Sequence, residues 1–216
     1  MRLVLLGPPG AGKGTQGTLL ADRYAIPQIS TGEILRHHVQ RGSKLGILAR
    51  SYMDRGEYVP DDVMVSMVRD RLTQGDAKHG FILDGFPRTV AQAQALERAL
   101  DGAGEPLTAV LKYSIGADQA VRRLLGRMTC ATCGRTYHAE FQPPAVEDVC
   151  DVCGGHLERR ADDDELTIRR RLAVYRAQAS PLEMFYVDRD ILYVVDALGT
   201  PDEVFERSLK YLEDLR

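Results

Sequence analysis

Short apolar segments alternate along the chain with longer segments in which apolar residues recur every three or four positions. The short runs predict buried strands, and the longer spacing predicts helices that bury one face. Their alternation is typical of a parallel sheet with helices on both sides, so we expect an α/β fold built on a parallel five-stranded sheet. The expected strands are residues 2–6, 28–30, 81–83, 108–115 and 191–195.

The clearest helical spacings fall on residues 64–72 and 91–100. From about residue 126 to 164 the alternation stops, because that stretch holds turn residues and paired cysteines but no helical period. We therefore expect a small domain to be inserted there. Apolar residues then recur from 168 to 186, which predicts a long helix, bent at Ser180-Pro181.

The start of the last helix is marked by its polar residues. Thr200 is expected to cap the helix, and Glu203 is spaced to complete a capping box with it. Pro201 suits the first turn, since the N–H that proline lacks would have no partner inside the helix. The last helix should therefore begin at about residue 200.

Composition limits the class of protein. Hydrophobic residues make up 44% of the 216 residues and charged residues 27%, with a formal net charge of −3. These values suit a folded soluble domain, by default a monomer, and argue against a disordered or membrane-spanning chain.

No long basic run is present, so nucleic acid is not expected as the main partner. The opening apolar run is too short for a signal peptide, which predicts a cytoplasmic protein. Asn is absent, which disfavours guanine-selective GTPases with an Asn-Lys-x-Asp motif.

A glycine-rich segment, Gly7-Pro-Pro-Gly-Ala-Gly-Lys-Gly-Thr15, lies between the first expected strand and a helix. This is the context of a phosphate-binding loop, in which backbone N–H groups and a helix N-terminus surround an anion. Lys13 adds a positive charge, and the hydroxyl comes at Thr15, one place later than usual. An ordinary glycine-rich turn is the alternative. The residues expected to hold phosphate, which the resemblance described below implies to be that of ATP, are Gly10, Ala11, Gly12, Lys13, Gly14 and Thr15.

A second polar group follows a buried strand at Asp84. In parallel sheets ligands collect at the carboxyl ends of the strands, so this acid should face the phosphate loop. A carboxylate there suits the shell of a magnesium ion, reached through water. The alternative is that Asp84 only forms the turn that continues through Gly85 and Pro87.

The cysteines form two C-x-x-C pairs, Cys130 with Cys133 and Cys150 with Cys153. This spacing suits a tetrahedral four-thiolate zinc site, which would be structural because it leaves no open coordination position. His138 and His156 are competing ligands, and a redox-active pair is another alternative. A zinc ribbon that binds nucleic acid is disfavoured by the acidic residues around it.

Taken together, the segments GPPGAGKGTQ, STGEILR, DGFPRT, LLGR, GRTYHAEF and RADD resemble the adenylate kinase family, in family order and over almost the whole chain. The paired cysteines make the chain similar to the long-lid, zinc-containing bacterial type. The resemblance implies a P-loop kinase core of residues 1–29, 60–125 and 164–216, an AMP-binding segment at 30–59 and a zinc-binding lid at 126–163. It also implies ATP, AMP and ADP as ligands, Mg²⁺ with ATP, and a structural Zn²⁺.

The resemblance further assigns roles to single residues. Asp162 and Asp163 are implied to help the lid close, and Gln92 to read the edge of the adenine of AMP. Beyond the phosphate loop, the implied ATP contacts are Arg127, Thr136, Tyr137 and the backbone of Gly199. The implied AMP contacts are Thr31, Gly32, Arg36, Glu57, Tyr58, Val59, Gly85, Arg88, Gln92, Arg160 and Arg171. The implied catalytic set is Lys13, Asp84, Arg88, Arg123, Arg160 and Arg171.

Several separate arginines suit phosphoryl transfer, because that reaction needs alignment and neutralised phosphate charge more than it needs a base. Each single arginine could instead be a surface charge. The predicted reaction is the Mg-dependent, reversible transfer from ATP to AMP, with flaps at residues 30–59 and 127–163 closing to exclude water. The alternatives are a UMP/CMP or GTP:AMP kinase, a P-loop ATPase or binding module, and a zinc-ribbon interaction protein.

Overall fold

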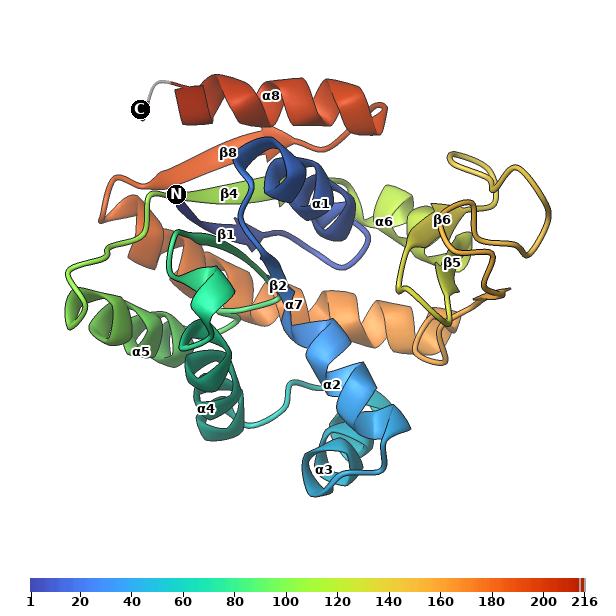
Figure 1. Ribbon diagram of the computed structural model, residues 1–216, viewed down its shortest axis with the longest axis horizontal. Helices are drawn as coiled ribbons and strands as arrows, with labels where there is room; N and C mark the ends of the chain where they lie inside the picture. The colour runs from blue at the N-terminus through green and yellow to red at the C-terminus, as the bar shows by residue number, and fades with distance from the viewer. Residues whose placement is uncertain (214, 216) are drawn as a thin grey trace.

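A parallel five-stranded sheet lies at the centre of the molecule, in the strand order β2-β3-β1-β4-β8 (Figure 1). The computed structural model describes residues 1–213 and 215. Leu3 pairs with Ile82 on one side and with Ala109 on the other, so β1 is flanked by parallel neighbours. The strands of this sheet are β1 (Arg2–Leu6), β2 (Gln28–Ser30), β3 (Phe81–Asp84), β4 (Ala109–Ser114) and β8 (Leu192–Asp196).

The expected strands and helices are confirmed with small shifts at their ends. The third strand is one residue longer than predicted and ends on Asp84 itself. The capping box at the last helix is present, since Thr200 N donates to Glu203 Oε2 at 2.8 Å and Glu203 N donates to Thr200 Oγ1 at 3.3 Å. The helices are α1 (Lys13–Tyr24), α2 (Thr31–Gln40), α3 (Lys44–Met53), α4 (Asp61–Leu72), α5 (Val90–Asp101), α6 (Ala117–Leu125), α7 (Glu165–Val187) and α8 (Pro201–Glu213), with a short 3₁₀ helix η1 (Gly75–Ala77).

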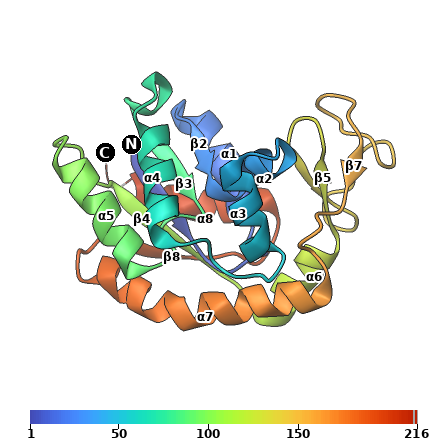
Figure 2. The ribbon, with the colours of Figure 1, turned by 90° about the horizontal axis from the view of Figure 1, so that it is seen from below.

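Two hydrophobic clusters cover the two faces of the sheet. On one face, side chains from α4, α5 and α7 pack on alternate strand residues such as Val4 and Leu83. On the other face, α1 and α8 pack on the intervening residues such as Leu5 and Ile82 (Figures 1 and 2). Both faces of the inner strands β1, β3 and β4 are buried, which explains their nearly continuous apolar sequences.

The predicted insertion forms a separate small sheet. β5 (Arg127–Cys130) pairs antiparallel with β6 (Thr136–His138) and with β7 (Leu157–Glu158), in the order β6-β5-β7. Figures 1 and 2 show this sheet extending from the end of the molecule that carries α6. Its buried cluster contains only Cys130, Tyr137, Cys150 and Leu157, with Met128 packed against it. A core this small needs additional support.

The insertion leaves and rejoins the main body between two packed helices. Ala120, Val121 and Leu124 of α6 contact Ile168 and Leu172 of α7 in a cluster of their own. The long helix predicted after the insertion is confirmed as α7. It continues through Pro181, where the structure has one unbroken helix, so the bend remains a prediction. Among the described helices, none has the length and apolarity needed to cross a bilayer.

Candidate functional site

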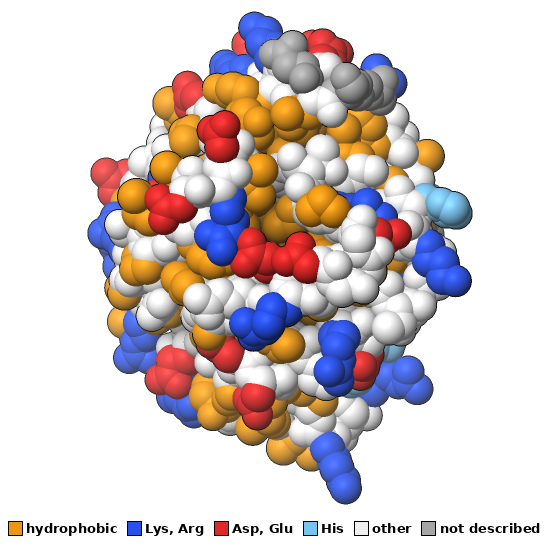
Figure 3. Space-filling model, turned by 90° about the vertical axis from the view of Figure 1, so that its left-hand side faces the viewer, with side chains coloured by type: hydrophobic (Ala, Val, Ile, Leu, Met, Phe, Trp, Pro, Cys, Tyr) orange, Lys and Arg blue, Asp and Glu red, His pale blue; other side chains and the backbone are white. Residues whose placement is uncertain are grey.

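The carboxyl ends of the central strands open into a cavity of about 1240 Å³. Its walls come from the loop after β1, from α2 and the segment after α3, from the loop after β3, and from the insertion and α7. Basic side chains gather here. At the opposite end of the molecule, basic and acidic side chains are interspersed over the surface (Figure 3). The sheet therefore gathers positive charge at its carboxyl end, whereas the face in Figure 3 carries both signs.

The loop between β1 and α1 has the conformation of an anion-binding turn. Gly10 has φ +84°, and a Cβ on it would lie 2.6 Å from Ala120 O, so only glycine fits there. Gly12 has φ +85° and stands directly before the first turn of α1. The helix N-terminus therefore points into the cavity with its backbone N–H groups free of side chains.

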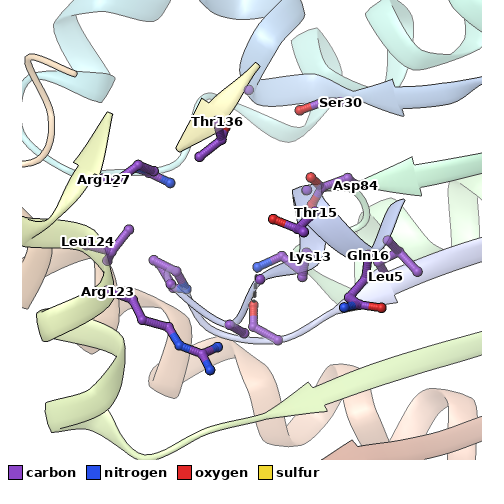
Figure 4. A pocket seen from close by; sticks show the side chains of 18 of the residues that line it. Leu5, Lys13, Thr15, Gln16, Ser30, Asp84, Arg123, Leu124, Arg127 and Thr136 are labelled. Atoms are coloured by element: carbon purple, nitrogen blue, oxygen red, sulfur yellow. Dashed lines mark hydrogen bonds between the residues drawn. The ribbon is translucent and has the colours of Figure 1, made fainter. Parts of the chain in front are cut away.

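Lys13 is held at the mouth of this loop. Its Nζ donates to Gly7 O at 2.8 Å and to Pro8 O at 2.9 Å (Figure 4). Burial lowers the pKa of Lys13 to about 8, and Arg88 adds to this effect, while Asp84 opposes it. The ammonium group is thus charged at neutral pH and lies in a place where an incoming anion would stabilise it further.

Asp84 borders the phosphate loop, as predicted from its position at the end of a strand. A Cβ placed on Gly14 would lie 3.7 Å from Asp84 Oδ2. Thr15 and Asp84 both line the cavity, and Figure 4 shows them on the same wall. A hydroxyl and a carboxylate are hard oxygen ligands, so this pair fits a magnesium ion or the water molecules around one.

The base of the insertion is held by a cluster of opposite charges. Arg127 donates from Nε to Asp163 Oδ2 at 2.8 Å and from Nη2 to Asp163 Oδ1 at 2.6 Å. Arg171 of α7 lies 2.8 Å from Asp162 Oδ2 and 3.3 Å from Asp163 Oδ1. Although burial favours the neutral acid, Arg171 and Arg127 hold the pKa of Asp162 below its ordinary value. These contacts connect the start of the insertion, its end and α7.

Three more arginines line the same cavity. Arg123 of α6 donates to Ala197 O at 2.9 Å, and Arg160 donates to Thr129 Oγ1 at 2.9 Å. Burial and the neighbouring Arg127 lower the pKa of Arg160 to about 9, which still leaves it charged at neutral pH. Arg36 of α2 is half-buried, and its guanidinium folds over Gly32. The positive charge is therefore fixed by local contacts before any anion arrives.

Arg88 is held between a carbonyl and an aromatic ring. Its Nε donates to Gly85 O at 2.7 Å, and its Cζ lies 4.9 Å from the centroid of the Tyr58 ring. The sequence analysis expected Tyr58 to contribute to this site, partly through its backbone. It gave no reason to expect the Tyr58 ring to lie against Arg88. The contact joins the segment after α3 to the loop after β3, which are far apart in sequence.

Gln92 lines the cavity with both ends of its amide in use. Its Oε1 accepts from Arg88 N at 2.8 Å, and its Nε2 donates to Asp61 Oδ1 at 2.7 Å. Asp61 is a residue that sequence reasoning missed. It belongs to no motif, and its only signal is its position as an acid at the start of a helix.

Among the residues predicted to contact nucleotides, all but Thr31 line this cavity. Thr31 is fully buried, and its hydroxyl donates to Gly85 O at 2.9 Å, so it supports the loop after β3 instead of facing the cavity. Tyr137 lines the cavity, while its ring is buried and its hydroxyl lies 3.5 Å from Cys150 Sγ. The side chain of Tyr137 thus belongs as much to the cysteine cluster as to the cavity.

The four cysteines come together in the insertion, with every Sγ within 4.8 Å of the others. Cys130 Sγ lies 3.5 Å from Cys153 Sγ, and Cys133 Sγ lies 3.6 Å from Cys150 Sγ. Sulfurs around a tetrahedral zinc at about 2.3 Å would be about 3.8 Å apart, so the arrangement fits that ion. Neither His138 nor His156 joins the cluster among the described residues; His138 Nδ1 instead accepts from the backbone of Glu140 at 3.0 Å.

Comparisons with known proteins agree over nearly the whole chain. The sequence model of the family described as "Adenylate kinase" matches residues 5–191. An adenylate kinase from Thermodesulfovibrio yellowstonii is 52% identical over 213 residues, which is 99% of each chain. An adenylate kinase from Acidothermus cellulolyticus is 51% identical over 212 residues, 98% of each chain, and one from Methanosarcina barkeri is 47% identical over 206 residues, 95% of each chain. The similarity therefore includes every wall of the cavity.

Proposed function

This chain belongs to the adenylate kinase family, and we propose that it catalyses the Mg-dependent, reversible transfer of a phosphoryl group from ATP to AMP, forming ADP. The observation that carries the proposal is the meeting of the phosphate loop with separate arginines in one cavity. Phosphoryl transfer requires alignment of donor and acceptor and neutralisation of the charge on the phosphate oxygens. A cavity with a fixed positive lining supplies both.

ATP would occupy the side of the cavity formed by the phosphate loop, α6 and the insertion. Its phosphates would lie at the N-terminus of α1 with Lys13 beside them, and Arg123 and Arg127 would approach from the opposite wall (Figure 4). Thr15 and Asp84 would hold the shell of a magnesium ion, which would supply positive charge against the phosphates when bound.

AMP would occupy the side formed by α2, the segment after α3 and the loop after β3. Arg36, Arg88 and Gln92 all line this side of the cavity, where the two arginines would bind the phosphate of AMP and Gln92 would meet its base. Arg160 and Arg171 line the cavity from the insertion and α7, and they would lie between the two nucleotides. Guanidinium groups suit this task because they bind phosphate oxygens in pairs and stay charged.

We assign residues 30–59 as the AMP-binding segment and 126–163 as the lid, with the remaining ranges as the core. In the lid, Asp162 and Asp163 are already paired with arginines at its base. Closing the lid excludes water, which would otherwise accept the phosphoryl group in place of AMP. The four cysteines support the assignment of a structural zinc, which would stabilise a lid whose own apolar core is small. A cytoplasmic monomer is the expected form, and gel filtration tests the oligomeric state.

The test is an acceptor panel with purified, zinc-replete protein. ATP and Mg²⁺ are supplied with AMP, dAMP, GMP, CMP or UMP, and diphosphate products are measured. We expect AMP to have the highest kcat/KM, and Lys13→Met to lower it by about 10²-fold or more. Lys78→Met, at an exposed lysine outside the cavity, is the matched control.

The outcomes separate the alternatives. Preferred phosphorylation of UMP or CMP would indicate a pyrimidine kinase, and phosphate release without any acceptor would indicate an ATPase. A faster reaction with GTP than with ATP would indicate a GTP:AMP kinase. Failure to convert an equal mixture of ATP and AMP into ADP would refute the proposed function.

A further inference from the structure

The amide of Gln92 is held by partners that fix which end is oxygen and which is nitrogen. The backbone N–H of Arg88 can only donate, so the atom 2.8 Å from it must be the amide oxygen. A carboxylate of Asp61 can only accept, so the atom 2.7 Å from Oδ1 must be the amide nitrogen. The orientation of the amide therefore follows from its environment, although oxygen and nitrogen are otherwise nearly identical in shape.

Asp61 is itself fixed by a second hydrogen bond. Its Oδ2 accepts from Thr89 Oγ1 at 2.8 Å, and the same Thr89 oxygen accepts from Gln92 N at 3.2 Å to cap α5. Asp61 is the first residue of α4, so these bonds join the starts of α4 and α5. Asp61 is absent from the cavity lining, whereas Gln92 is part of it. Asp61 thus contacts Gln92 but not the space for the nucleotide.

The fixed amide still has one free position at each end. Gln92 is about 1% exposed, and after its two bonds it keeps one lone pair on Oε1 and one N–H on Nε2. Adenine presents an amino donor at position 6 and an acceptor at N1, which complement these two groups. Hypoxanthine and guanine present an oxygen at position 6 and an N–H at N1, which would place acceptor against acceptor and donor against donor.

We propose that Asp61 is a positioning residue that determines which purine the acceptor site takes, by holding Gln92 in the orientation that suits a 6-aminopurine and rejects a 6-oxopurine. The inference rests on the proposed function, in which Gln92 meets the base of the acceptor. A buried polar group left facing one of its own kind costs enough to give a preference of at least about 10-fold. The neighbouring Asp62 is exposed in the same helical turn and has no such contact.

The experiment compares AMP with IMP as acceptors at saturating ATP and Mg²⁺. Wild-type protein should use AMP with a kcat/KM at least about 10-fold above that for IMP. Asp61→Asn should reduce this AMP/IMP ratio several-fold, because an Asn amide can accept or donate and leaves the N–H of Arg88 as the one remaining group that disfavours a flipped Gln92. The KM for ATP should stay unchanged. Asp62→Asn removes the same charge from the same end of α4 and should leave the ratio as in the wild type.

Several outcomes would overturn the inference without touching the proposed reaction. One is equal use of AMP and IMP by the wild type, which needs no variant. Another is an Asp61→Asn protein that loses activity with both acceptors in parallel, since a purely structural role predicts that result. If Asp61→Asn does not fold, Asp61→Ser, whose hydroxyl is too short to reach Gln92, must show the same change in the ratio. A wild-type protein that phosphorylates neither AMP nor IMP would instead refute the proposed function.

Discussion

Replacing Asp163 with Asn removes the carboxylate that holds two arginines at the base of the lid. The Asp163 side chain is 2% exposed and accepts two hydrogen bonds from Arg127, at 2.8 and 2.6 Å. Asn keeps the shape but has one acceptor oxygen, and it leaves the guanidinium of Arg127, 16% exposed, without its direct ion-pair partner. Breaking a buried pair costs about 3–5 kcal/mol.

The lower end of that range applies here. Arg171 keeps its 2.8 Å contact with Asp162, and both arginines retain some access to water. A loss of about 3 kcal/mol, at about 2–4 °C per kcal/mol for a chain of this size, lowers Tm by about 6–12 °C. This loss of stability is expected for the nucleotide-free protein, because phosphates of a bound nucleotide would replace the missing negative charge.

The assay is thermal unfolding of zinc-replete protein without nucleotides, followed by circular dichroism and by calorimetry. Glu147→Gln removes an exposed negative charge from the same lid and should change Tm by less than about 2 °C. If Asp163→Asn melts within about 2 °C of the wild type, the ion pair does not stabilise the fold. The contacts at the base of the lid would then have to be explained by function alone.

Three further results are expected. Burial lowers the pKa of Lys13 from 10.5 to about 8, so the unfolded chain binds more protons than the folded chain between these values, and this group makes stability rise with pH there. In the same pH range kcat/KM for ATP should fall as Lys13 loses its charge. Lys13→Arg should have a lower kcat/KM but should not show this fall. If the variant shows the same fall as the wild type, the pH dependence does not come from Lys13. Arg88→Ala should lower kcat/KM for AMP by about 10- to 100-fold, measured against Arg98→Ala as an exposed control on α5, and equal activity of the two variants would remove Arg88 from the site. Cys130→Ser should reduce the zinc content below about one ion per chain and lower the protection of lid amides from hydrogen exchange, whereas full occupancy would reject the four-thiolate site.

The periodicity of the sequence was sufficient to predict the central fold, because strands and helices buried on a known side leave a regular pattern. β1 and β2 match their predicted bounds, β3 differs by one residue at one end, and β4 and β8 differ by one residue at each end. The phosphate loop and the cysteine cluster could also be predicted from the sequence, since the spacing of their residues determines the local geometry. In each of these features the residues that matter are close together in the sequence, so their order along the chain is enough to identify the feature.

Contacts between distant segments could not be predicted in the same way. The ring of Tyr58 against Arg88 and the bond between Asp61 and Gln92 depend on how α4, α5 and the segment after α3 pack. Thr31 shows the same limit, because its motif gave its position in the chain but not the direction of its hydroxyl. Side-chain direction follows from the backbone and the neighbours together, and only the backbone pattern is visible in one sequence.

The packing of α6 on α7 has a consequence for how the enzyme could be rebuilt. The insertion begins directly after α6 and ends directly before α7, and these two helices pack on each other. A short loop could therefore join α6 to α7 in its place without disturbing the helices on either face of the central sheet. A chimaera with a shorter or metal-free insertion would keep the same packing of α6 on α7. The exchange is limited by the ion pairs at the junction, because Arg171 of α7 contacts Asp162 and Asp163 of the insertion, so a replacement segment has to keep or substitute these contacts.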